Sequence, residues 1–68
     1  MTKLQMIERI KELNKKSIEV LGWSKYTKIF SAFAKELGIK EMYVAKSWKK
    51  ERIEKHLTLA LIVADCCE

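Results

Sequence analysis

Turn-forming residues are almost absent from this chain. Its 68 residues contain no proline and only two glycines, Gly22 and Gly38. A β-sandwich or barrel needs many tight turns, and two glycines cannot supply them. The abundant lysine, glutamate, leucine, isoleucine and alanine residues favour helices. The sequence therefore predicts an all-α fold, a compact bundle of four to five helices that forms a single domain over residues 1–68.

Capping residues and apolar spacing divide the chain into helical segments. Thr2 and Gln5 have the form of a capping box, which predicts that a first helix starts next to them. Ser24 is a suitable N-cap for a second helix, and Gly38 is suited to the left-handed residue at its end. The predicted helices cover about residues 3–22, 25–37, 41–50 and 52–64.

The second predicted helix has the clearest apolar face. Its apolar residues recur at helical spacing, at Tyr26, Ile29, Phe30, Phe33, Ala34 and Leu37. In the third, Val44 and Trp48 are expected to point inward, and we expect Trp23 to belong to the core as well. In the fourth, the predicted inward face contains Ile53, Leu57, Ala60, Leu61 and Ala64.

Positive charge is concentrated in the middle of the chain. Fourteen basic residues oppose nine acidic ones, which gives a net charge of +5. Residues 23–55 carry nine of the basic and four of the acidic groups, whereas residues 56–68 carry only two acidic groups. Such an excess is typical of proteins that bind nucleic acid or an anionic membrane, although it also keeps a small domain soluble.

Signals for several other classes of protein are missing. The start, Met1 to Leu4, lacks the apolar core of a signal peptide, and the apolar run at 57–64 is too short to span a membrane, so we expect a cytoplasmic protein. His56 is the only histidine, and its spacing from Cys66 and Cys67 matches no zinc pattern. Neither a catalytic group nor a glycine-rich phosphate loop is recognisable. We therefore expect no enzyme, cofactor, metal or small-molecule substrate.

The junction of the second and third predicted helices, within about residues 25–50, is typical of a helix-turn-helix. Ala34 lets the next helix approach closely, Gly38 adopts a positive φ without a Cβ clash, and Ile39 fills the space beneath the turn. The next helix then packs its inner face on the domain and presents its outer face. The structural residues predicted for this motif are Ala34, Gly38, Ile39, Val44 and Trp48.

The segment Phe33–Ile39, followed by Ser47–Lys50, resembles the DNA-binding domains of the lambda-repressor-like family, which includes phage regulators of the CI and CII kind. The resemblance covers roughly residues 24–64. It implies a sequence-specific transcriptional regulator, of the phage or mobile-element repressor type, that binds double-stranded DNA. A basic recognition helix would enter the major groove.

The resemblance also implies which residues contact DNA. Base-facing positions are Lys40, Glu41, Met42, Tyr43, Lys46 and Lys49. Phosphate contacts are expected from Lys25, Tyr26, Lys28, Lys50 and Arg52, with Lys55 as a further candidate. The alternative interpretation is that the lysines form an ordinary solvated surface and that Tyr26 belongs to the core.

The C-terminal segment suggests a partner subunit, because its apolar residues occupy more than one helix face. Regulators of this size usually act as dimers, so we expect a homodimer through this segment, with Leu59 or Ile62 at the interface. The domain core could instead use all of these residues. The alternative function is a helical protein–protein interaction module, such as an anti-repressor or inhibitor. A basic protein that lies on a membrane surface is a third and less favoured class.

Overall fold

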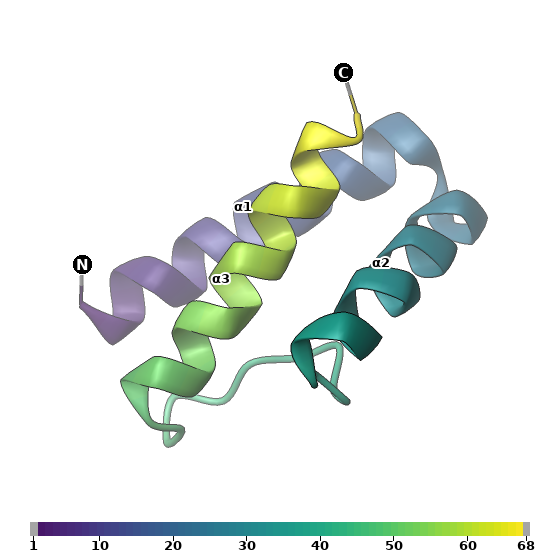
Figure 1. Ribbon diagram of the computed structural model, residues 1–68. Helices are drawn as coiled ribbons and strands as arrows, with labels where there is room; N and C mark the ends of the chain where they lie inside the picture. Colours follow the sequence, from purple (N-terminus) through teal and green to yellow (C-terminus); the bar gives the residue numbers. More distant parts are fainter. Residues whose placement is uncertain (1, 68) are drawn as a thin grey trace.

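The computed structural model describes residues 2–67, which form three helices (Figure 1). They are α1 (Lys3–Leu21), α2 (Trp23–Leu37) and α3 (Lys50–Asp65). The described residues contain no strand, so the all-α prediction is confirmed. The predicted number of helices is wrong, because these residues form three helices rather than four to five.

Local capping explains where α1 begins and where α2 follows it. The Thr2 hydroxyl accepts a hydrogen bond from the Gln5 N–H at 3.2 Å, and the Gln5 side chain accepts one from the Thr2 N–H at 2.9 Å, which confirms the capping box. Gly22, at φ 83°, both ends α1 and precedes the first residue of α2. Ser24 is therefore not the N-cap, because α2 begins two residues earlier than predicted, at Trp23, and Ser24 lies inside the helix.

The end of α2 agrees with the prediction, but the predicted third helix does not form. Gly38 adopts φ 74°, and the Ile39 N–H donates to the Ala34 carbonyl at 2.8 Å. Residues 38–49 then form an irregular loop that runs across one end of the molecule to the start of α3 (Figure 1). The helix-turn-helix predicted over about residues 25–50 is therefore not confirmed.

The failure of the third helix has a physical reason. A helix over residues 41–50 would present only two large apolar side chains inward, which is too little to offset the cost of helix nucleation. An irregular chain also covers more distance per residue than a helix, which rises only about 1.5 Å per residue. Residues 38–49 can therefore connect the end of α2 to the start of α3 more easily as a loop. Val44 and Trp48 still pack against the core, so their inward direction is confirmed.

The helix α3 packs against both other helices and divides the core into two clusters. Ile53 and Ala60 of α3 meet one face of α1, whose buried residues are Met6, Ile7, Ile10 and Leu13. Leu59 and Val63 of α3 meet α2 and the loop through Tyr26, Phe30, Ala34 and Ile39. Because α3 is covered on two sides, it buries a wider face than a helix that packs against one neighbour.

Three predictions about individual apolar residues are wrong. Trp23 is 62% exposed and lies outside the core, because the reversal at Gly22 turns its ring toward solvent. The buried face of α3 contains Leu59, whereas Leu61 is 44% exposed, because contact with two helices rotates the buried face from the predicted one. Leu59 is fully buried within this chain and cannot lie at a subunit interface.

The homodimer itself stays a prediction, with Leu61 and the half-buried Ile62 as the remaining apolar residues of that segment. Within residues 2–67, no helix combines the length and apolar character needed to cross a membrane.

Candidate nucleic-acid interface

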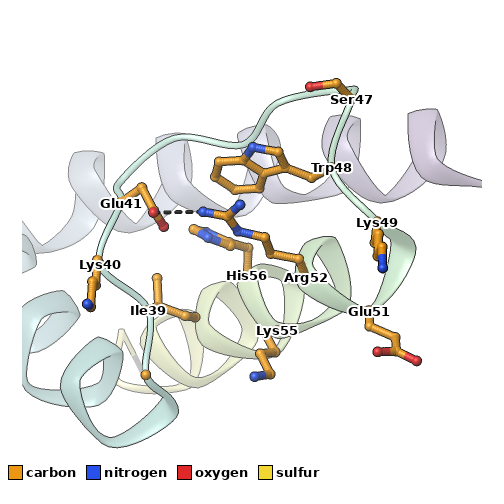
Figure 2. Close-up of a pocket in the computed structure, with 11 residues that line it drawn as sticks. Ile39, Lys40, Glu41, Ser47, Trp48, Lys49, Glu51, Arg52, Lys55 and His56 are labelled. Atoms are coloured by element: carbon orange, nitrogen blue, oxygen red, sulfur yellow. Dashed lines mark hydrogen bonds and ion pairs between the residues drawn. The ribbon is translucent and has the colours of Figure 1, made fainter.

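The 38–49 loop and the first turns of α3 enclose a hollow of about 630 Å³, which we call the loop–α3 hollow (Figure 2). One wall consists of residues 38–41 and 47–49 of the loop, and the other consists of α3. The lining residues with polar or aromatic side chains include Lys40, Glu41, Trp48, Arg52, Lys55 and His56. The volume lies within the range of about 300–1,000 Å³ that is usual for ligand sites.

Arg52 connects both arms of the loop to α3. Its Nη2 donates to the Glu41 carboxylate at 2.7 Å, and its guanidinium carbon lies 3.8 Å from the centre of the Trp48 ring (Figure 2). The first contact is a charge-assisted hydrogen bond and the second a cation–π interaction. Glu41 lies near the start of the loop and Trp48 near its end, so these two contacts hold the loop in place.

Trp48 is the centre of an aromatic cluster. Its ring centre lies 5.6 Å from that of Tyr43 and 5.4 Å from that of His56, with tilted planes in both pairs. Such separations are favourable for aromatic pairs. The ring is half-buried, and it also packs against the cluster between α1 and α3. Trp48 therefore links the hollow to the hydrophobic core.

His56 lies at the base of the hollow and is only 4% exposed. Its ring points toward Trp48 and the Arg52–Glu41 pair (Figure 2). Among residues 2–67, no side chain forms a hydrogen bond or ion pair with it. Burial lowers the pKa of His56 below its usual value of 6.5, while Glu41 raises this pKa and Arg52 lowers it further by smaller amounts.

The lowered pKa of His56 predicts that stability depends on pH. The unfolded chain binds a proton at His56 near pH 6.5, whereas the folded protein binds it only at lower pH. The free energy of unfolding should therefore be greatest above pH 6.5 and fall as the pH is lowered toward the pKa of the folded state. Urea denaturation at pH 7.5 and 5.5 measures this difference. His56→Gln should have a smaller difference, and an unchanged wild-type midpoint would contradict the prediction.

The structure brings only some of the predicted site residues together. The predicted base-facing residues all lie on the loop, where Lys40, Met42, Tyr43, Lys46 and Lys49 are exposed and Glu41 is partly buried. Of the predicted phosphate contacts, Lys50, Arg52 and Lys55 lie on the first turns of α3. These residues therefore share one end of the molecule.

The remaining predicted phosphate contacts lie elsewhere. Lys25 and Lys28 are exposed in the first half of α2, roughly 15–20 Å along the helix from the loop at 1.5 Å per residue. Tyr26 is only 2% exposed, and burial raises the pKa of its hydroxyl. We therefore place Tyr26 in the core, as in the alternative interpretation.

His56 is the site residue that sequence reasoning missed. The sequence offers His56 only as a candidate metal ligand, and among residues 2–67 no three histidine, cysteine or acidic residues lie together as a metal site would require. A signal for it is present in the sequence, since Trp48, Arg52 and His56 are spaced by four residues. In a helix, such spacing places side chains on one face. Here Arg52 and His56 lie on α3, and Trp48 lies in the loop just before it.

Comparisons with protein families, curated proteins and solved structures found no significant match to this chain. The resemblance to lambda-repressor-like domains therefore stays a prediction from the sequence.

Proposed function

We propose that this protein is a small regulator that binds double-stranded DNA through the 38–49 loop and the first turns of α3. The observation that carries the proposal is the charge of this surface. Residues 38–55 contain six basic and three acidic side chains. Glu41 and Arg52 form an ion pair, which leaves five basic and two acidic side chains. The phosphate backbone of DNA attracts a cluster of this kind, and releases counterions when the cluster binds.

The start of α3 strengthens this attraction. Lys49 occupies the N-cap position and makes no side-chain cap to the helix. The first N–H groups of a helix carry a partial positive charge and readily accept an anion. Lys49 and Lys50 flank this point and add two full positive charges, of which the acidic Glu51 in the first turn offsets one. We therefore propose that a DNA phosphate lies against the first turn of α3.

Base reading requires side chains that extend beyond the phosphate contacts. Tyr43, which is 66% exposed, and Met42 project from the loop between Lys40 and Lys46. Apolar side chains can contact the thymine methyl group in the major groove, and lysine can donate to guanine. We propose that this part of the loop reads sequence, in place of the recognition helix that the sequence predicts.

Fluorescence anisotropy with a labelled duplex of mixed sequence tests the proposal. The variant Lys46→Ala/Lys50→Ala removes two exposed charges from the proposed interface, and neither residue lines the loop–α3 hollow. We expect this variant to bind about tenfold more weakly near 0.1 M salt. The slope of log affinity against log salt should become shallower by about 2, because each lost phosphate contact lowers it by about 1.

A matched control removes the same charge from another surface. Lys11 and Lys15 are exposed on α1, and Lys11→Ala/Lys15→Ala leaves the loop unchanged. This control should keep the wild-type salt slope. Equal losses in both variants, or no binding of the wild type near 0.05 M salt, would contradict the proposal. The second result would favour the alternative function, a protein–protein interaction module.

A further inference from the structure

We infer that the loop–α3 hollow binds one phosphate group, which accepts hydrogen bonds from His56, Arg52, Lys40 and Lys55. This inference rests on the proposed DNA binding and names a specific contact within it. The phosphate can belong to the backbone or to the end of a strand, and both sources present the same oxygen atoms.

His56 is the first observation that points to a ligand. The His56 ring is more than nine-tenths buried and lines the hollow, yet no side chain within residues 2–67 bonds to it. In Figure 2 the ring points toward the space beside Glu41 and Arg52. Its nitrogens are not among the fully buried polar atoms without a partner, so they open onto the hollow, where a ligand oxygen can bond to them.

The charge of the lining favours an anion, because four basic side chains border the hollow and only two acidic ones, Glu41 and Glu51, do. Lys40 and Lys55 border the hollow, and neither forms an ion pair within the described residues. Arg52 has five N–H donors, and its bond to Glu41 occupies one of them. A phosphate offers several acceptor oxygens at once, which suits a hollow bordered by donors from the loop and from α3.

The position of the hollow connects it to the proposed DNA interface. The start of α3, which has no side-chain cap, borders one edge of the hollow with Lys49 and Glu51. The exposed residues of the loop lie next to this edge. The volume of about 630 Å³ leaves room for a sugar attached to the phosphate. A strand that crosses the loop can therefore place one phosphate in the hollow while its neighbours contact Lys46 and Lys50.

Nuclear magnetic resonance of the His56 ring tests this inference directly. Because His56 is the only histidine, its ring gives a single unambiguous signal. The probes are inorganic phosphate, a duplex with 5′-hydroxyl ends and the same duplex with 5′-phosphate ends, each compared with chloride at equal ionic strength and pH. We expect the signal to shift and saturate with inorganic phosphate and with at least one duplex.

Two double variants distinguish a specific phosphate site from a nonspecific effect of the added ions on His56. Lys40→Ala/Lys55→Ala should weaken the response of His56 to phosphate at least tenfold, whereas Lys11→Ala/Lys15→Ala should leave it unchanged. A shift with both duplexes assigns the contact to a backbone phosphate. A shift only with the phosphorylated duplex assigns it to a strand end.

The outcome is distinguishable from that of the proposed function. If the duplex binds and Lys46→Ala/Lys50→Ala weakens binding while the His56 signal stays still with every probe, the inference is overturned and the DNA-binding proposal stands. If inorganic phosphate shifts His56 in the wild type but no duplex binds, the phosphate site stands and the DNA-binding proposal fails. A response equally strong in Lys40→Ala/Lys55→Ala overturns the site as described.

Discussion

Replacing Leu59 by glutamate should unfold the protein at room temperature. Leu59 is fully buried between α3 and α2, so the substitution removes apolar packing and places a carboxylate where no partner is available. We expect a loss of more than about 4 kcal/mol. A domain of this length has about 3–10 kcal/mol of stability in total, at about 0.05–0.15 kcal/mol per residue. Circular dichroism should show loss of the helical signal.

Leu61→Glu is the matched control for this prediction. Leu61 lies two residues further along the same helix but is largely exposed, so the variant should stay helical and lose less than about 1 kcal/mol. A Leu59→Glu variant as stable in urea denaturation as Leu61→Glu would contradict the arrangement of α3 between its neighbours. The solution mass of Leu61→Glu also tests the predicted homodimer, because a dimer held through this exposed face would dissociate.

Trp48→Ala should release the 38–49 loop from the helices. The substitution removes the face that Arg52 covers, the contacts with Tyr43 and His56, and packing against the core between α1 and α3. We expect a loss of about 2–3 kcal/mol in the free energy of unfolding, below the usual cost for a fully buried tryptophan because the ring is half-buried. Urea denaturation followed by circular dichroism measures this loss.

Two further variants define what Trp48 contributes. Trp23→Ala removes the other tryptophan, which is mostly exposed, and should cost less than about 1 kcal/mol. Trp48→Phe keeps an aromatic face for Arg52 and should recover part of the stability. If Trp48→Ala and Trp23→Ala had equal effects, Trp48 would not anchor the loop. The DNA affinity of folded Trp48→Ala should also fall, because the proposed interface depends on the position of the loop.

The parts of the fold that the sequence predicts well depend on interactions between near neighbours in the chain. The capping box joins Thr2 to Gln5, three residues apart. Gly38 ends α2 through a bond from Ile39 to Ala34, which are five residues apart. The energies of such contacts hardly depend on the rest of the protein, so their residue types are sufficient signals.

The candidate site was predicted only in part. The sequence shows that residues 23–55 are basic, and the lysines of the loop do share one end of the molecule with Lys50, Arg52 and Lys55. It does not show the pair of Arg52 with Glu41, which are eleven residues apart and meet only because the loop folds back. The apolar spacing of Val44 and Trp48 indicated burial correctly, but burial from a loop and burial from a helix leave the same pattern.

The sequence by itself determined the all-α class, the start and end of α1, the C-terminal end of α2, and the location of the excess positive charge. Only the tertiary structure decided that residues 38–49 form a loop and that α3 buries Leu59 and His56 rather than Leu61. The buried face of a helix depends on where its neighbours lie, and α3 has one neighbour on each of two sides. A loop that connects two packed helices takes its path from their ends, so its conformation follows from packing over long sequence separations rather than from the propensity of its own residues.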